Sequence, residues 1–202
     1  MSAVVRPSPF SLHRWLSPTL FDFWAGQINP LWTLREPLAR LVRREPAGEG
    51  AATLILRCNR HWAGMRAGQH VTLGVELEGR VWQRSYSPTP LSGRELAITV
   101  KAVEGGRVSQ HLVNQARPGD LFRIDAAFGD FHMPAAAPVL LLAAGSGITP
   151  MRSLLREACQ RPLGAPVDLF YWERTAAAIQ FRDELHTLAT ATPGLRVHLL
   201  TT

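Results

Sequence analysis

The chain has 202 residues, 46% of them hydrophobic, which is enough for one large domain or two small domains with a real core. Its formal net charge is +6, and every cationic side chain except Lys101 is an arginine. A basic surface favours acidic partners such as an electron carrier or an anionic membrane. The arginines are scattered rather than gathered into a stripe, which argues against a nucleic-acid-binding protein.

The chain has two cysteines, Cys58 and Cys159, which are far apart and lack a paired spacing. This argues against a zinc site of the usual kind and against an iron–sulfur cluster held by cysteines of this chain. Because the seven histidines also lack ligand spacing, we expect no metal site. The start of the chain is not ordered like a signal peptide, and no run approaches the roughly 20 apolar residues of a membrane span. We therefore predict a cytoplasmic protein.

Residues 1–50 predict an N-terminal helical extension, rich in aromatic residues and interrupted by Pro18 and Pro30. The apolar residues are Phe10, Trp15, Leu16, Leu20, Phe21, Phe23, Trp24, Ile28, Leu31, Trp32 and Leu34. We interpret the segment as packing these side chains on the body of the protein. The alternative is a peripheral docking surface for a membrane or a membrane-bound partner, with Arg35, Arg40, Arg43 and Arg44 as its cations. Pro46 and residues 48–50 are typical of a linker.

Residues 51–135 predict a domain of short strands separated by glycine and proline. The expected strands are 53–59, 70–77, 81–87, 95–103 and 121–125, with one helix at 108–115. Many short strands with a single helix favour a closed antiparallel barrel.

Residues 136–202 predict a parallel α/β domain. Residues 139–144 are continuously apolar, as in a parallel strand covered on both faces. Thr149 is expected to cap the following helix and Pro150 to occupy its first turn. The expected elements are a helix at 151–160, a strand at 167–171, a helix at 179–190 and a strand at 195–200. This order is half of a doubly wound nucleotide-binding domain, so we expect the domain to be incomplete in this sequence.

The run Arg84-Ser85-Tyr86-Ser87 is the first cluster with a chemical meaning. On a strand, Arg84 and Tyr86 point to one face and the two serines to the other. The guanidinium suits a diphosphate, and the tyrosine ring suits a flat heteroaromatic ring. The Ser87 hydroxyl suits a ring nitrogen that changes protonation during redox chemistry. Taken alone, the run also fits an ordinary barrel strand with an exposed arginine.

Two glycine-rich turns follow. Gly105-Gly106-Arg107-Val108-Ser109 opens the helix of the barrel, and free backbone amides at such a start attract an anion. Gly145-Ser146-Gly147-Ile148-Thr149-Pro150 joins a buried strand to a helix, which is the geometry that accepts a dinucleotide pyrophosphate. Pro150 stands where the Gly-x-Gly-x-x-Gly fingerprint has its last glycine, which argues against a plain Rossmann dehydrogenase.

The order of these motifs over residues 50–202 resembles the ferredoxin–NADP reductase superfamily of flavoproteins. The aromatic extension is similar to bacterial reductases that supply electrons to membrane fatty-acid desaturases. Many of those carry a C-terminal plant-type 2Fe-2S domain, which the resemblance implies beyond the present sequence. The fold it implies is an antiparallel FAD-binding barrel followed by a parallel NAD(P)-binding α/β domain. FMN in place of FAD is the alternative cofactor.

The resemblance also implies roles for individual residues. Arg84 would hold the FAD phosphates, Tyr86 would pack on the isoalloxazine and ribityl portion, and Ser87 would lie near flavin N5, with Ser85 in the same strand. The remaining FAD contacts implied are Thr99, Val100 and Lys101 through backbone groups, and Gly106, Arg107, Val108 and Ser109 at the pyrophosphate. The NAD(P)H contacts implied are Gly145, Ser146, Gly147, Thr149 and Pro150. Ser87 and Thr149 are thus the expected catalytic residues.

Arg174 follows the second strand of the α/β domain, where members of this family bind the adenosine ribose. It would pair with a 2′-phosphate and favour NADPH over NADH. The alternative is an ordinary surface arginine. We therefore expect hydride to pass from NAD(P)H through FAD to an iron–sulfur, ferredoxin-type acceptor. A free flavin reductase, an oxygenase reductase component and a non-enzymatic FAD-bearing electron-transfer subunit are the alternative functions.

Overall fold

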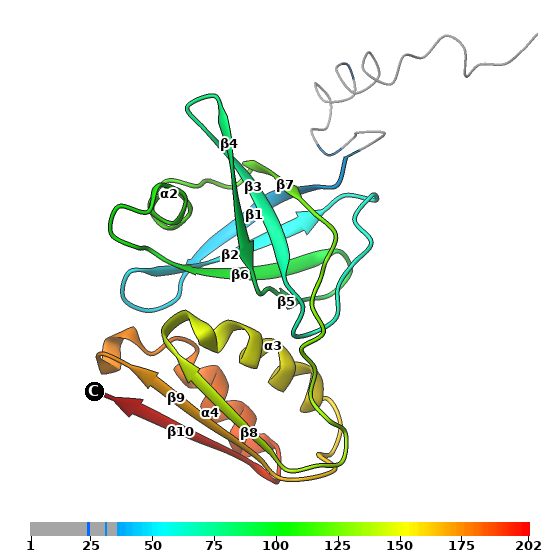
Figure 1. Cartoon of the computed structure of the whole chain (residues 1–202), viewed down its shortest axis with the longest axis vertical. Coiled ribbons are helices and arrows are strands. Elements are labelled where there is room, and N and C mark those ends of the chain that lie inside the picture. The colour runs from blue at the N-terminus through cyan, green and yellow to red at the C-terminus, as the bar shows by residue number, and fades with distance from the viewer. Residues whose placement is uncertain (1–23, 25–30, 32–35) are drawn as a thin grey trace, which may run out of the picture. The chain divides into compact units, whose positions relative to one another are not determined.

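The computed structural model describes residues 24, 31 and 36–202. The chain divides into two compact units, Met1–Glu36 and Pro37–Thr202. Apart from Trp24 and Leu31, the aromatic segment predicted as an extension lies outside the described residues, as do both interpretations of it. The architecture that follows is that of the second unit (Figure 1).

The first half of this unit is an antiparallel seven-stranded half-barrel. Its strands are β1 (Leu38–Pro46), β2 (Ala51–Cys58), β3 (Val71–Leu77), β4 (Arg80–Tyr86), β5 (Thr89–Pro90), β6 (Glu95–Lys101) and β7 (Leu121–Ile124). They pair in the order β4-β3-β7-β1-β2-β6-β5. Alternate side chains of β3, β1 and β7 face the core, as expected for strands with one buried face. The predicted antiparallel domain is confirmed.

Strand β1 lies within the segment that the sequence assigned to the extension. It pairs with β2, with Leu41 opposite Leu56, and Ala39 and Leu41 are fully buried. Residues 47–50 form a hairpin turn, closed by a 3.1 Å bond from the Ala47 amide to the Ala51 carbonyl, so the predicted linker is wrong. Apolar and arginine residues alternate in β1, which is typical of a strand. The aromatic residues that precede β1 dominate the composition of residues 1–50 and obscured this pattern.

One helix packs against the half-barrel. Helix α2 (Arg107–Asn114) buries Val108 and Leu112 in the same apolar cluster as Leu54 and Ile98. Full burial of each such side chain contributes about 1.5–3 kcal/mol. Arg44 of β1 donates to the Val113 carbonyl of this helix, which ties β1 to α2.

The second half is a three-stranded parallel sheet with two crossover helices. The elements are β8 (Val139–Ala144), η2 (Gly145–Gly147), α3 (Ile148–Ala158), β9 (Val167–Glu173), η3 (Ala176–Ala178), α4 (Arg182–Ala191) and β10 (Leu195–Thr201). The strand order is β10-β9-β8, and every pair is parallel. The predicted β-α-β-α-β order is confirmed. None of the helices formed by the described residues is long and apolar enough to cross a bilayer.

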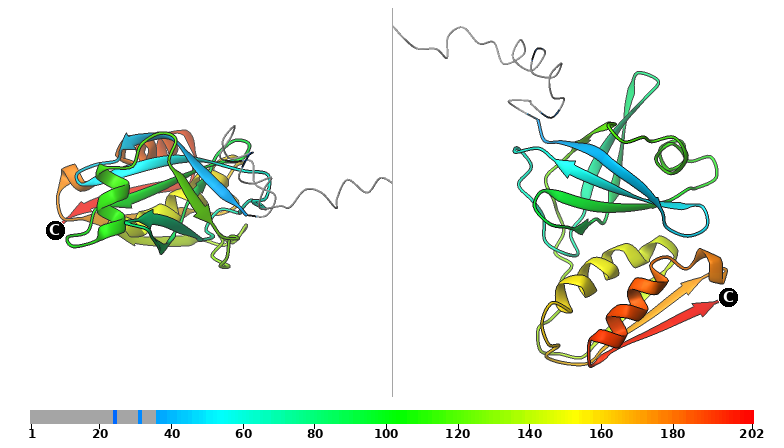
Figure 2. Two further views of the ribbon diagram at one scale, coloured as in Figure 1. Left: turned by 90° about the horizontal axis from the view of Figure 1, so that it is seen from above. Right: turned by 180° about the vertical axis from the view of Figure 1, so that it is seen from behind.

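Only one face of this parallel sheet is covered by helices. Because both crossovers step in the same direction and share one hand, α3 and α4 lie on the same face (Figure 2). Leu140 and Leu142, on the other face of β8, are 61% and 57% exposed. The prediction that β8 is covered on both faces is therefore wrong for the described residues.

Candidate functional site

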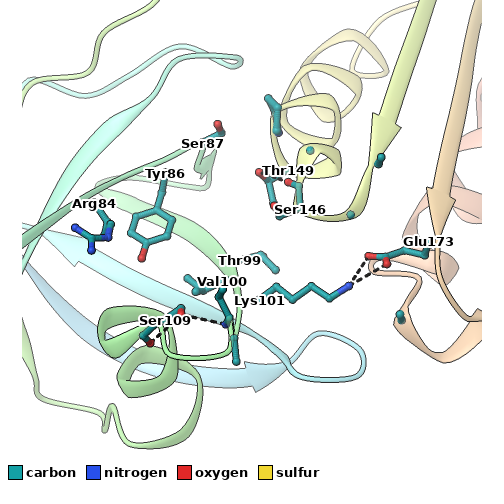
Figure 3. Close-up of a pocket in the computed structure, with 18 of the residues that line it drawn as sticks. Arg84, Tyr86, Ser87, Thr99, Val100, Lys101, Ser109, Ser146, Thr149 and Glu173 are labelled. Atoms are coloured by element: carbon teal, nitrogen blue, oxygen red, sulfur yellow. Dashed lines mark hydrogen bonds and ion pairs between the residues drawn. The ribbon is translucent and has the colours of Figure 1, made fainter.

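A cavity of about 1500 Å³ lies between the half-barrel and the α/β lobe. Every residue predicted to contact a cofactor lines it, from the Arg84 run through the two glycine turns to Arg174 (Figure 3). The volume exceeds the roughly 300–1,000 Å³ typical of a pocket for one small ligand. The fold thus brings three separate sequence motifs to one space that is larger than a typical single-ligand pocket.

Arg84 and Tyr86 end β4 and enter the cavity side by side (Figure 3). The Tyr86 ring also packs against the apolar cluster of the half-barrel. Burial raises the pKa of Tyr86 to about 12, opposed by the neighbouring Arg84 cation. The phenol is therefore neutral at physiological pH, and its ring offers a flat apolar surface beside a guanidinium. These groups fit the ring and the phosphates of a flavin nucleotide.

The Ser87 hydroxyl is held by a residue that the sequence did not single out. His70 Nδ1 lies 2.7 Å from Ser87 Oγ. The His70 ring in turn contacts Phe128, with ring centroids 5.7 Å apart, and the two residues exchange backbone hydrogen bonds of 2.8 and 2.9 Å. His70 therefore orients the hydroxyl, although histidine spacing in the sequence showed no sign of a site.

The start of α2 has the features of an anion site. The helix begins after Gly106 with no side-chain cap and no acidic residue in its first turn. A Cβ at Gly106 would lie 2.5 Å from Ser109 Oγ and 3.1 Å from the Val103 carbonyl, so a larger residue there would displace the Ser109 hydroxyl. The Ser109 hydroxyl accepts from the Val103 amide and donates to the Gly106 carbonyl, at 3.1 Å in both cases. First-turn amides without a cap suit the diphosphate of FAD.

Several predicted FAD contacts have side chains that are engaged elsewhere. The Thr99 hydroxyl lies 2.7 Å from the Thr53 hydroxyl, and Val108 is buried in the core. The Arg107 guanidinium lies over the Trp82 ring at 5.6 Å. Thr99 and Val108 would therefore contact a flavin or a diphosphate through their backbone groups, whereas the Arg107 side chain is 65% exposed.

The second glycine turn, Gly145–Gly147, lies where the sequence predicted it, but the helix after it begins earlier than expected. Gly145 adopts a φ of +54°, and Gly145–Gly147 form a 3₁₀ turn that continues directly into α3 at Ile148. The Thr149 hydroxyl donates to the Ser146 carbonyl at 3.1 Å. Thr149 is thus inside the first turn rather than its cap, because the 3₁₀ turn already supplies the start of the helix. The predicted cap is wrong, while Thr149 still lines the cavity.

A partly buried ion pair joins the two lobes across the cavity. Lys101, which ends β6, donates from Nζ to both carboxylate oxygens of Glu173, which ends β9, at 3.0 and 2.9 Å. The Glu173 side chain is only 2% exposed. Sequence reasoning expected backbone contacts from Lys101 and did not select Glu173. A charged residue at the end of a strand is weak evidence for a functional site as long as its partner in another domain is unknown.

Two oxidoreductase families match the chain in succession. Residues 39–133 match the family described as oxidoreductase FAD-binding domain, and residues 141–202 match the oxidoreductase NAD-binding domain. The chain carries the FAD-binding and NAD-binding domains of the ferredoxin reductase superfamily. The two matches divide where β7 gives way to β8, so each half of the cavity belongs to one nucleotide-binding domain.

Relatives support this assignment along most of the chain. The sequence is 38% identical over 194 residues to an NADPH oxidoreductase of Mycobacterium tuberculosis, covering 91% of the chain and 50% of the relative. It is 30% identical over 136 residues to a ferredoxin–NAD(P)⁺ reductase component of naphthalene 1,2-dioxygenase/salicylate 5-hydroxylase systems from a Ralstonia species, covering 66% of the chain and 40% of the relative. The chain thus spans half or less of the length of these relatives.

A solved structure shares the fold. The flavohem-like FAD/NAD-binding domain of a nitric oxide dioxygenase from Vibrio cholerae superimposes with a TM-score of 0.74 and 25% identity, covering 83% of this chain and 75% of that one. The half-barrel followed by the parallel lobe is therefore the arrangement of FAD/NAD-binding domains in this superfamily.

Proposed function

We propose that this protein accepts hydride from NADPH or NADH on a bound FAD and passes the electrons to an iron–sulfur acceptor. The observation that carries the proposal is the single cavity lined by both the Arg84–Ser87 run and the Gly145–Pro150 turn. Hydride transfer requires the donor and acceptor carbon and nitrogen to approach about 3–3.5 Å, which two nucleotides bound in one cavity can meet.

The half-barrel supplies the FAD contacts in this proposal. Arg84 pairs with the phosphates, the first-turn amides of α2 bind the pyrophosphate, and the neutral Tyr86 ring packs on the flavin. Ser87, oriented by His70, hydrogen-bonds the ring nitrogen that gains and loses a proton. When bound, FAD supplies the redox chemistry, taking two electrons together and releasing them singly. The protein residues bind and orient it.

The α/β lobe supplies the nicotinamide contacts. The Gly145–Gly147 turn lies at the carboxyl end of β8, where open parallel sheets bind nucleotides. Thr149 and Pro150 line the same cavity as Tyr86 and Ser87. Arg174 follows β9 and suits a 2′-phosphate, so NADPH is the preferred donor in this proposal.

An iron–sulfur protein or domain is the acceptor that the relatives favour. The Ralstonia relative is a ferredoxin–NAD(P)⁺ reductase component of a dioxygenase system. The glycine betaine monooxygenase reductase subunit of Chromohalobacter salexigens, 32% identical over 139 residues, belongs to another oxygenase system. A reductase component of an oxygenase is therefore the second candidate function. A membrane fatty-acid desaturase at the end of the electron path remains the narrower form of the proposal.

The decisive experiment is anaerobic titration of the FAD-reconstituted protein. Addition of NADPH is expected to bleach the oxidised-flavin absorption band, and a reduced ferredoxin-type 2Fe-2S protein should appear when it is present as the acceptor. A spectrum that stays unchanged with NADPH and NADH while FAD remains bound would overturn the proposal. Repeated turnover with added free flavin but none with the 2Fe-2S protein would support a free flavin reductase instead.

A further inference from the structure

We propose that Lys101 is a specificity-determining residue that acts through Glu173. By pairing with the Glu173 carboxylate, Lys101 keeps this acid from binding the hydroxyls of an adenosine ribose and leaves the adjoining part of the cavity to a 2′-phosphate. This inference rests on the proposed function, because it assigns the coenzyme preference of the same cavity.

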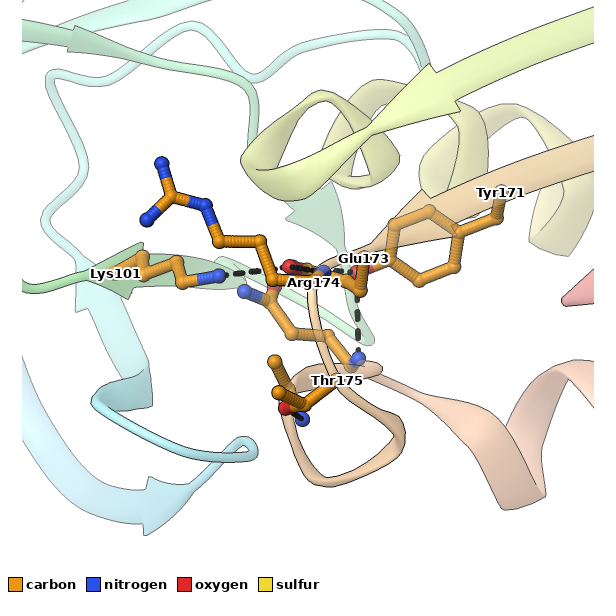
Figure 4. A network of polar contacts seen from close by, with 7 residues as sticks. Lys101, Tyr171, Glu173, Arg174 and Thr175 are labelled. Carbon is orange, nitrogen blue, oxygen red and sulfur yellow. Dashed lines mark hydrogen bonds and ion pairs between the residues drawn. The ribbon is translucent and has the colours of Figure 1, made fainter. Parts of the chain in front are cut away.

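All four contacts of the Glu173 carboxylate are internal (Figure 4). One oxygen accepts from Lys101 Nζ at 3.0 Å and from the Tyr171 hydroxyl at 3.2 Å. The other accepts from Lys101 Nζ at 2.9 Å and from the Arg174 amide at 3.4 Å. The carboxylate is thus satisfied by the protein and has no remaining need of a ligand hydroxyl.

The position of Glu173 is the one at which an acid would otherwise select NADH. It ends β9, next to the strand that leads into the Gly145 turn, and parallel sheets bind the nucleotide beyond these strand ends. In dinucleotide-binding sheets, an acidic residue near such a strand end hydrogen-bonds the ribose 2′-hydroxyl and repels a 2′-phosphate. Glu173 occupies the position for this role, but its negative charge is already compensated by Lys101.

The groups around the pair complete a site for an anion. Lys101 is 32% exposed at its side chain and lines the cavity together with Arg174 and Thr175. Arg174 lines the cavity, and its guanidinium has no marked contact with the other residues of the network (Figure 4). Because the Lys101–Glu173 pair carries no net charge, the Arg174 guanidinium supplies the positive charge that suits a phosphate monoester.

The test compares Lys101→Met, Glu173→Gln and the double variant, each reconstituted with FAD. The probes are 2′-phospho-AMP and AMP in direct binding measurements, and NADPH and NADH in flavin reduction. Lys101→Met should weaken 2′-phospho-AMP and NADPH by about tenfold, because it leaves an uncompensated carboxylate beside the phosphate. AMP and NADH should bind as well as in the wild type or more tightly, because the freed Glu173 carboxylate can then accept from the ribose hydroxyls. The double variant should recover most of the loss, since the repelling charge is gone.

The matched control is Arg57→Met, which removes another cation paired with a carboxylate of β6. Arg57 Nη2 lies 2.6 Å from Glu95, outside the cavity, so its loss should leave the NADPH/NADH ratio unchanged. If Lys101→Met fails to fold, Glu173→Gln still decides, because it should keep or increase the preference for NADPH.

Three results would overturn the inference. The first is an equal loss of affinity for NADPH and NADH in Lys101→Met. The second is a double variant that does not recover the affinity for NADPH. The third is a preference that shifts toward NADH in Glu173→Gln. If NADPH bleaches the flavin of the wild type but the NADPH/NADH ratio is the same in all the variants, only this inference is contradicted. Flavin that neither coenzyme reduces would contradict the proposed function, while binding of 2′-phospho-AMP would still test the Lys101–Glu173 pair.

Discussion

His70 Nδ1 and Ser87 Oγ lie 2.7 Å apart and both residues line the cavity, His70 directly before β3 and Ser87 directly after β4. A hydroxyl bonded to an imidazole can either donate or accept, because the histidine can change its tautomer. Ser87 can therefore serve a ring nitrogen both before and after that nitrogen is protonated. His70 is therefore the residue that orients the Ser87 hydroxyl.

Removal of this partner should slow flavin reduction more than it weakens FAD binding. In His70→Leu the Ser87 hydroxyl loses the bond that orients it, and loss of one hydrogen bond of about 1–1.5 kcal/mol corresponds to about a tenfold lower rate. Anaerobic stopped-flow reduction by NADPH measures it. The double variant His70→Leu/Ser87→Ala should be no slower than Ser87→Ala. A double variant whose rate loss is the product of the two single losses would show that the residues act independently.

Substitution of Gly106 should reduce the affinity for FAD. In Gly106→Ala the new Cβ would lie 2.5 Å from Ser109 Oγ, so the Ser109 hydroxyl must move and lose its bonds to the Val103 amide and the Gly106 carbonyl, which hold the start of α2. We expect at least about tenfold weaker binding, measured by flavin fluorescence. Gly147→Ala is the matched comparison, because its Cβ meets nothing within 4 Å. Equal losses of FAD affinity in the two variants would contradict this role of Gly106.

Alkaline pH should destabilise the protein in part through Cys58. Burial raises the pKa of the Cys58 thiol from 9.0 to about 12. The unfolded state therefore loses this proton first, and the free energy of unfolding falls as the pH rises from about 9 toward 12, by up to about 1.4 kcal/mol per pH unit for one proton. Urea unfolding of wild type and Cys58→Ala at pH 7 and pH 10.5 measures it. Cys58→Ala should be less stable than the wild type at pH 7, but its free energy of unfolding should fall less between pH 7 and pH 10.5. An equal fall in both proteins would show that the Cys58 thiol does not cause the alkaline destabilisation.

The Arg152–Glu184 pair should hold α3 to α4. Arg152 is 8% exposed, lies 2.9 Å from Glu184 and stands over the Phe181 ring at 4.2 Å. Arg152→Met leaves a carboxylate with less compensation and removes the ring contact, so we expect a loss of about 2–3 kcal/mol in urea unfolding.

Arg156→Met is the control for this pair. Arg156 bonds the same Glu184 at 2.9 Å, but its side chain is 42% exposed. An exposed pair contributes at most about 1 kcal/mol, so this variant should unfold near the wild-type midpoint. A loss in Arg156→Met equal to that in Arg152→Met would mean that burial does not set the strength of the contact.

The sequence alone determined the features that depend on neighbouring residues. The apolar run of β8, the glycine turn after it and the alternation with helices predicted the α/β lobe, because the type and order of these elements follow from local composition. The Arg84–Ser87 run and the Gly105–Gly106 helix start were likewise visible, since each is a short contiguous pattern. The sequence placed the motifs of the cavity in these elements before their distances were known.

The tertiary structure alone decided which distant residues meet. β1 became a barrel strand because β2 and β7 pair with it, although its composition blends into the aromatic segment before it. Leu140 and Leu142 are exposed because both helices cross on one face, which depends on strand order rather than on hydrophobicity. His70 and Glu173 gained partners 17 and 72 residues away. Such pairings arise from packing between elements, and no period or spacing along the chain encodes them.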